Sequence, residues 1–427
     1  MKKHSNKSLT LFLTLMMMLT AFVTPPVNGH SSTRTDIPTW YQGDSWTYEG
    51  TVWGEGTNWS IDATIQDLKN LVTGIVTVTE NGEEYECYQV EITGTIKGNF
   101  TWDILSGEID GVIEGTSYYR ISDLAQVKTH IHSYGEVDMP LPLDYEYNST
   151  NTFNPPLENF DFPIKVGEQW EISSQVTTES HFYLEGLYDE TSSNTSWVNK
   201  TLECTKKQTV KTPAGSFNSF LITNPNDEAD DSLFYSPKAG NIVKGEVYYS
   251  DENNSFEAHI NLKTYSRKTQ PLTITETLFP LEFIQGEEVK ISGKITNSET
   301  GEPIKNTVIS IEIPATEETY HTTTDDNGNY EKTITPHVIQ DHTPSTIEIG
   351  SDGVIVKCTK GSLTGYRVKT LVSIDHNTPP KKPMYINGVT KGYANETYSY
   401  STSTYDLNYD QLYYLFDWGD GSNGSWV

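Results

Sequence analysis

The residues best suited to chemistry lie near the end of the chain, where oxygen-bearing side chains alternate. Asp406, Asn408 and Asp410 occupy every second position of one loop, and a turn can bring such side chains around one centre. Carboxylate and amide oxygens are the ligands that calcium prefers. The pattern therefore predicts a calcium site. The alternative is a solvated turn whose Asp and Asn side chains bond their own backbone.

Two other groups of polar residues have the composition of a site. His130 and His132 would share one face of a strand and could both contact a metal. No third ligand follows at a spacing typical of zinc sites. We therefore favour a polar strand face over a zinc site as the interpretation of these histidines. The acidic run at residues 227–231 is interpreted as a hairpin tip that faces water.

Catalytic signatures are missing from the sequence. It contains no HExxH, no GxSxG elbow, no Walker loop and no GxGxxG that opens a helix. The sequence does not exclude glycoside hydrolysis by a pair of carboxylates, because 58 acidic residues offer many pairs. The sequence predicts a protein that is not an enzyme, with no cofactor other than calcium.

Sequons of the form Asn-x-Ser/Thr predict N-glycosylation if the chain is exported. A chain so rich in Asn, Ser and Thr also produces such triplets by chance. The predicted glycan sites are Asn58, Asn99, Asn148, Asn194, Asn199, Asn253, Asn395 and Asn423.

The elements that must position these residues are β strands. Clusters of Gly, Asn and Asp divide the chain into short alternating runs rich in Thr, Val, Ile and Tyr. Long apolar stretches with a 3.6-residue period are absent. We therefore expect an all-β protein, with tandem Ig-like β-sandwich modules after an N-terminal duplicated antiparallel region.

The duplication is expected over residues 30–154 and 155–269. Gly-Asp-Ser-Trp46 opens the first copy, and Gly-Glu-Gln-Trp170 opens the second. Later in each copy a tyrosine stands nine residues before a lysine, as in Tyr119 to Lys128 and again from residue 235 to 244. The region is similar to curved sheets of exported proteins, including lipoprotein-carrier half-barrels. That similarity implies an alternative role as carrier of an apolar ligand, although both tryptophans are expected in the core.

Residues 270–376 show a cleaner alternation, with seven or eight runs bounded by turns. Val289, Ile291 and Ile295 should point one way from one strand, and residues 309, 311 and 313 from another. The run from Gly286 and the turns near residues 301 and 328 resemble Ig-like or carboxypeptidase-regulatory-like repeats. In such proteins the module is a spacer or an adhesive unit. Residues 377–383 are predicted to form a stiff proline-rich linker.

The last segment, residues 384–427, ends in an aromatic strand that leads into Gly-Asp-Gly. Phe416-Asp-Trp-Gly-Asp-Gly-Ser422 resembles the signature of PKD (polycystic kidney disease) domains, which are Ig-like sandwiches of extracellular and cell-surface proteins. The resemblance implies that an acidic loop before this strand can bind calcium, with Asp417 or Asp420 completing the set of ligands. Because a sandwich needs about 80–100 residues, we expect the sequence to stop inside this domain.

The N-terminus and the overall charge indicate export. Lysines at positions 2, 3 and 7 precede an apolar run over residues 9–23, which is the layout of a signal peptide at residues 1–29. The alternative is an uncleaved membrane anchor. Without those lysines, 26 basic residues face 58 acidic ones, and a surface this acidic repels nucleic acid. Three cysteines without CxxC spacing are interpreted as buried and unpaired.

The combined patterns predict a non-catalytic, secreted or cell-surface protein of archaeal type. Its expected roles are adhesion, envelope structure, or binding of extracellular protein or carbohydrate, and abundant tyrosine and tryptophan could stack on sugar rings. Its expected partners are therefore other surface proteins or carbohydrate. No nucleic acid is expected, and membrane association would require an anchor outside this sequence. Besides ligand carriage, the remaining alternative is the accessory region of a secreted hydrolase.

Overall fold

The computed structural model describes residues 34–102, 105–139, 141–226, 231–250, 254–340 and 348–374, together with residues 388–389, 391, 396–402, 404 and 414–416. Within these residues the regular structure is β strand, apart from one short 3-10 turn at Pro314–Thr316. The predicted all-β class is confirmed. None of the described residues forms a helix long and apolar enough to span a membrane.

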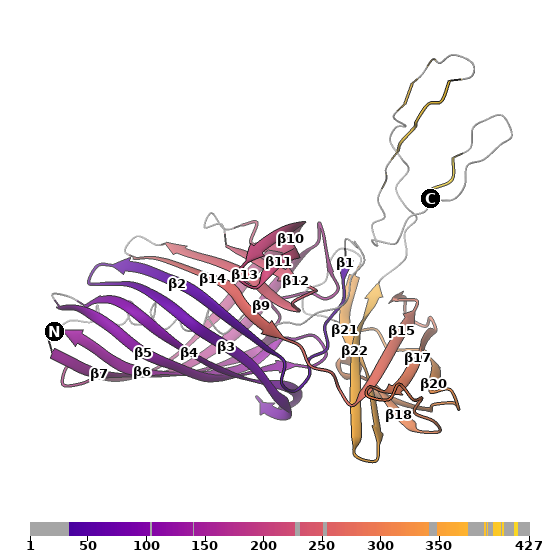
Figure 1. The fold of residues 1–427 in the computed structure, drawn as a ribbon, viewed down its shortest axis with the longest axis horizontal. Coiled ribbons are helices and arrows are strands. Elements are labelled where there is room, and N and C mark those ends of the chain that lie inside the picture. The colour runs from indigo at the N-terminus through magenta and orange to yellow at the C-terminus, as the bar shows by residue number, and fades with distance from the viewer. Residues whose placement is uncertain are drawn as a thin grey trace.

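The first and larger unit is a closed antiparallel barrel (Figure 1). A two-stranded pair, β1 (Arg34–Thr35) with β8 (Ile164–Lys165), lies outside the barrel sheet. The barrel strands are β2 (Ser45–Gly56), β3 (Trp59–Glu80), β4 (Glu83–Trp102), β5 (Leu105–Arg120), β6 (Gln126–Met139), β7 (Leu141–Leu157), β9 (Gln169–Leu184), β10 (Tyr188–Thr212), β11 (Gly215–Thr223), β12 (Ser232–Ser236), β13 (Asn241–Ser250) and β14 (Asn254–Ser266). They follow one another in chain order around the wall, with β14 pairing β2 and β7 pairing β9.

The barrel interior is a packed core. Alternation along each strand sends every second side chain inward, and large aromatic side chains such as Trp46, Tyr48 and Tyr147 are fully buried there. Trp170 is buried as well, so the prediction that both repeat tryptophans are core residues is confirmed. The apolar-ligand alternative would therefore need a site other than the centre of the barrel.

The two halves of the barrel begin with the same local geometry. Gly43 and Gly167 both have positive φ angles, +91° and +89°, a conformation that glycine adopts without strain. Each donates its N–H to a carbonyl of a neighbouring strand at 2.7 Å, to Val72 and to Cys204 respectively. The same turn therefore starts both halves.

The tyrosine anchors also match between the halves. In the β5–β6 pair the register shifts between Tyr118 and Tyr119, and in the β12–β13 pair it shifts between Phe234 and Tyr235. These are equivalent positions in the two copies. The halves nevertheless close one barrel around one core, because each would otherwise leave two unpaired sheet edges.

The second unit consists of two sheets that enclose a separate hydrophobic core. Val289, Ile291, Ile295, Ile309, Ile311 and Ile313 are buried in that core, as the alternation predicts. The three-stranded sheet contains β15 (Leu272–Phe279), β17 (Val289–Asn297) and β20 (Asn329–Ile334). The five-stranded sheet contains β16 (Glu282–Phe283), β22 (Leu363–Ile374), β21 (Glu348–Lys360), β18 (Val308–Ile313) and β19 (Glu318–Thr323).

Strands β21 and β22 stand against one end of the barrel (Figure 1). Ile355 of β21 and Val368 of β22 are fully buried and belong to the core of the barrel. We call this contact the junction. It is formed by residues 36–41, 86–88, 120–125 and 161–165 on the barrel side and residues 351–370 on the two-sheet side.

Candidate functional site

The predicted calcium ligands Asp406, Asn408, Asp410 and Asp417 lie outside the described residues. The same holds for sequons Asn253, Asn395 and Asn423, for the signal peptide, for residues 227–230 of the acidic run, and for the proline-rich linker. Among the described residues no group of three or more His, Cys, Asp or Glu side chains could hold a metal.

The described sequons differ in their accessibility. Asn148 is half-buried, and its amide donates a hydrogen bond to Glu146 at 2.9 Å. The others, at Asn58, Asn99, Asn194 and Asn199, are exposed. Of these, Asn199 accepts a hydrogen bond from the Ser173 hydroxyl at 2.9 Å through its Oδ1. The exposed asparagines are more accessible to a glycosylating enzyme than Asn148.

The two histidines contact different partners. His130 Nδ1 lies 3.1 Å from the Thr150 hydroxyl, whereas His132 Nε2 lies 3.2 Å from Glu146 and its ring stacks on Tyr134. Both side chains thus belong to a polar outer face of the barrel, which agrees with the preferred interpretation. The three cysteines, Cys87, Cys204 and Cys358, are buried and unpaired, as predicted.

The junction is held first by polar contacts from the segment that leads into β2. Asp36 accepts hydrogen bonds from the Lys369 ammonium at 2.9 Å and from the Thr370 N–H at 2.8 Å. Burial raises the pKa of Asp36, but the Lys369 charge and these hydrogen bonds outweigh burial and lower it. Farther along, Val368 donates its N–H to the Thr39 hydroxyl at 3.1 Å. A carboxylate and a hydroxyl thus satisfy backbone groups of the other unit.

Aromatic rings complete this part of the junction. The Trp40 ring packs against the Tyr88 ring with centroids 4.8 Å apart. The Tyr366 hydroxyl donates a hydrogen bond to the Trp40 carbonyl, and its ring lies 6.4 Å from that of Tyr88. Buried aromatic side chains provide much of the energy of protein contacts, so these rings stabilise the contact between the two units.

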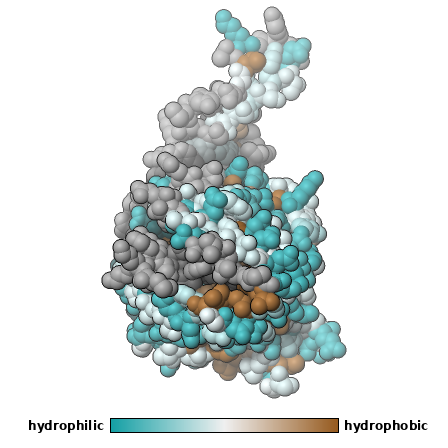
Figure 2. Space-filling model, turned by 90° about the vertical axis from the view of Figure 1, so that its left-hand side faces the viewer, coloured by the Kyte–Doolittle hydropathy of each residue, from teal (hydrophilic) through white to brown (hydrophobic). Residues whose placement is uncertain are grey.

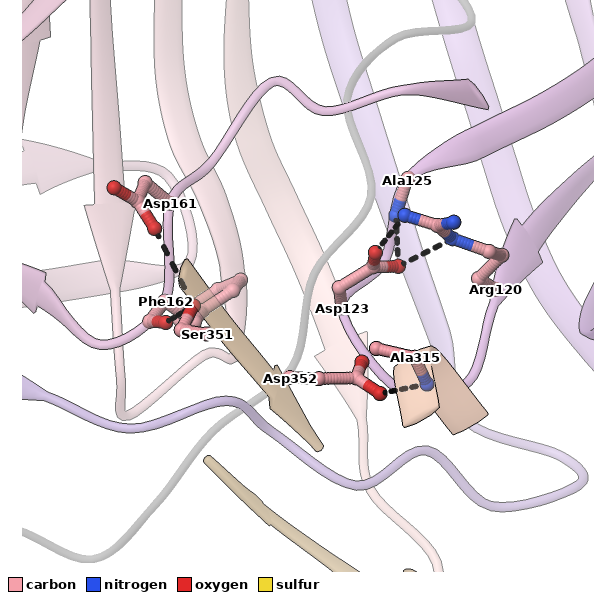
Figure 3. Close-up of polar contacts among 8 residues, drawn as sticks. All are labelled: Arg120, Asp123, Ala125, Asp161, Phe162, Ala315, Ser351 and Asp352. Carbon is pink, nitrogen blue, oxygen red and sulfur yellow. Dashed lines mark hydrogen bonds and ion pairs between the residues drawn. The ribbon is translucent and has the colours of Figure 1, made fainter. Parts of the chain in front are cut away.

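Figure 3 shows the acidic part of the junction, where Asp123 and Asp352 approach each other from the two units. Asp123 is paired with Arg120 and accepts the Ala125 N–H at 2.9 Å. Asp352 accepts the Ala315 N–H at 2.7 Å. Burial, followed by the Asp123 charge, raises the pKa of Asp352 to about 6.

A second contact in Figure 3 fixes β21 directly to the barrel chain. The Ser351 hydroxyl donates a hydrogen bond to the Phe162 carbonyl at 2.6 Å. Next to it, a Cβ added to Gly353 would collide with the backbone oxygen of Ser122. The two backbones are therefore too close for any side chain at position 353.

The sequence did not reveal the residues of the junction. Arg120 and Asp123 are three positions apart and suggest at most a local ion pair. Asp352 lies two residues before the apolar run at residues 354–356 of β21, and a charge beside such a run could have indicated a buried contact. Its approach to Asp123 spans 229 positions, which only the tertiary structure can reveal.

A break in the barrel wall is the second notable feature. β10 pairs with β9 from Tyr188 to Glu203, but it pairs with β11 only from Glu203 onward. Beside this break lies an open cleft of about 580 Å³, which is lined by Glu171, Ile172, Ser173, Asn199, Lys200, Thr201, Asn224 and Asn226. A smaller apolar recess of about 110 Å³ adjoins it at Leu202 and Val247.

The free end of the barrel, opposite the junction, is mostly hydrophilic with one small apolar area (Figure 2). The exposed leucines at hairpin tips of the barrel are Leu141 and Leu187, with 70% and 54% of their surface exposed. Asp144 and Glu185 lie beside these tips and are linked by a backbone hydrogen bond of 2.9 Å. Acidic residues thus accompany the exposed leucines.

Comparisons with known proteins give little additional information. No protein family matches the chain, and no curated protein matches it. Among solved structures, one similar chain is the Ca²⁺-stabilised adhesin with which an Antarctic bacterium binds ice (11% identity, 74% of this chain, 94% of that chain, TM-score 0.17). Another is the native α-2-macroglobulin of E. coli (7% identity, 86% of this chain, 34% of that chain, TM-score 0.18). At these TM-scores neither likeness carries an argument about fold or function.

Proposed function

We propose that the chain is a non-catalytic, exported surface protein in which the barrel is a rigid head and the two-sheet unit is its support. One observation carries the proposal, namely the junction. There, Ile355 and Val368 of the two-sheet unit enter the core of the barrel. Domains that must move relative to each other usually meet through small polar interfaces. A hydrophobic core shared by the two units supports a protein that keeps the barrel in a fixed orientation relative to the two-sheet unit.

The identity of the modules belongs to the same proposal. The two-sheet unit is an Ig-like sandwich, and residues 384–427 belong to a PKD-like domain that follows it in the chain. A signal peptide at residues 1–29 directs export, and the excess of acidic residues, with a net charge of −29, keeps the surface soluble and free of polyanions. The head contacts other surface proteins or carbohydrate through its strand edges and loops.

Export and surface display are tested on intact cells of the source organism. A membrane-impermeant amine label should modify the protein before lysis, because most of the lysines that the structure describes are exposed, and external protease should release it. A cytoplasmic protein of known identity serves as the control. Labelling only after lysis would contradict the proposal.

Calcium at Asp406, Asn408, Asp410 and Asp417 is proposed for the PKD-like module, residues 384–427. That module should melt at a higher temperature with calcium than with a chelator, because ligands that bind only the folded state stabilise it. Asp410→Ala should remove the difference. An unchanged melting temperature on adding calcium to the wild type would refute the site without affecting the proposal for the head.

A further inference from the structure

The outer stretch of β10 is an unprotected strand edge. Among the described residues, Tyr188–Leu202 pairs with β9 on one side and with no strand on the other. Every second residue of such a stretch directs its N–H and C=O away from the existing partner. These groups form a template for another strand, which proteins usually block with charges, prolines or bulges.

The centre of this edge has none of those devices. From Thr191 to Asn199 the strand contains no charge, no proline and no register shift against β9. Trp197, in the middle of the edge, is 59% exposed. The adjoining cleft of about 580 Å³ leaves room beside the strand at Asn199 and Thr201. The edge is therefore both accessible and suited to backbone pairing.

The charges at its two ends are complementary. Glu190 stands at one end and Lys200 at the other. Directly opposite residues of an antiparallel pair point to the same face of the sheet. When a strand pairs with the same strand of a second copy, this condition holds only if the central residue of one copy lies opposite the same residue of the other. With Thr195 at the centre, Glu190 of each copy lies opposite Lys200 of the second copy. Neighbouring registers, centred on residue 194 or 196, do not bring these charges together.

We propose that the protein self-associates through this edge, with the β10 strands of two copies pairing antiparallel about Thr195. Glu190–Lys200 contains eleven residues, a paired length of about 37 Å, and provides on the order of ten backbone hydrogen bonds. Trp197 of each copy then lies over Ser193 and Thr195 of the other, which removes its ring from water. The association is isologous and closes at a dimer.

Existing contacts leave both charges available. Lys200 lies 3.8 Å from Asp231, which is a loose ion pair, and its side chain is 42% exposed. Glu190 accepts a hydrogen bond from the Tyr188 hydroxyl and keeps its second oxygen. The sequons at Asn194 and Asn199 differ by an odd number of positions, so their side chains point to opposite faces of the sheet. Glycans there would leave the edge itself clear.

The first test is the oligomeric state of the full chain by sedimentation over a concentration series. We expect a mass of twice 48.0 kDa at high concentration. Lys200→Glu should shift the protein to monomer, because like charges then face each other at both ends. The double variant Glu190→Lys, Lys200→Glu should restore the dimer. A monomer at every concentration would overturn the proposal.

A cysteine cross-link tests the register. Thr195→Cys should form an intermolecular disulfide, since directly opposite Cα atoms lie about 4.5–5.5 Å apart and disulfides need about 4.4–6.8 Å. Thr201→Cys is the matched control, because residue 201 would lie opposite Asp189 and should not cross-link. The native cysteines are buried and should not interfere. The inference is refuted if the Lys200→Glu variant still forms a dimer and the Thr195→Cys variant does not cross-link. Such a dimer would use another surface.

Discussion

Replacing Asp352 by asparagine should stabilise the protein at neutral pH. Asp352 is buried at the junction beside Asp123, and burial, followed by the interaction with Asp123, raises its pKa from 3.8 to about 6. The unfolded chain therefore ionises above about pH 4, while the folded protein holds the proton until about pH 6. The free energy of unfolding therefore falls as the pH rises from about 4 to about 6, and it stays lower at higher pH. At neutral pH, ionisation of Asp352 lowers the free energy of unfolding by roughly 3 kcal/mol.

Asparagine resembles the neutral acid in shape. Its oxygen can accept the Ala315 N–H, and its neutral amide places no negative charge beside Asp123. The variant removes the cost of ionising a buried group without opening a cavity. We expect a gain that is near zero at about pH 4 and reaches at most about 3 kcal/mol at neutral pH.

The assay is urea unfolding followed by tryptophan fluorescence at several pH values for wild type and variant. Asp62→Asn is the matched control, because it removes one charge from an exposed position. The control should change stability by no more than about 0.5 kcal/mol at any pH. A gain from Asp352→Asn that does not depend on pH, or a loss at neutral pH, would refute the reasoning.

Three further predictions concern backbone contact, buried charge and glycan occupancy. Gly353→Ala should loosen the junction, because the added Cβ meets the Ser122 oxygen; limited proteolysis should then cut between the units, while Gly82→Ala, at an open turn, should not promote that cleavage. Lys165→Met should cost about 3 kcal/mol of unfolding free energy in denaturation, because Lys165 is only 3% exposed and lies 3.7 Å from the Glu282 carboxylate; no loss would contradict that role. Asn148 should carry less glycan than the exposed sequons when peptides are analysed by mass spectrometry, and equal occupancy would show that its contact with Glu146 is no barrier.

Sequence alone was informative about the two-sheet unit. Val289 and Ile291 alternate with polar residues, and a half-buried strand must place alternate side chains on one face. The turns followed from glycines at positions that need positive φ, such as Gly301 and Gly328. These signals are local, so they survive without knowledge of the rest of the fold.

The repeat was visible for the same reason. Trp46 and Trp170 mark equivalent turns because the local hydrogen-bond pattern requires glycine three residues earlier in both copies. The sequence did not show how the outer strands of the two repeats pair with each other. The expected half-barrels close into one barrel through pairings such as β14 with β2, and the partners of those pairings are about 200 residues apart in sequence.

The sequence by itself determined the all-β class, the duplicated turns and the inward faces of the strands, because each depends on residues within a few positions of one another. Only the tertiary structure decided that two halves share one core, that Asp123 and Asp352 meet across the junction, and that β10 runs beyond β11 to leave an open edge. Those features depend on which distant strands end beside each other. Strand lengths and sheet closure set that outcome, and local alternation does not encode them.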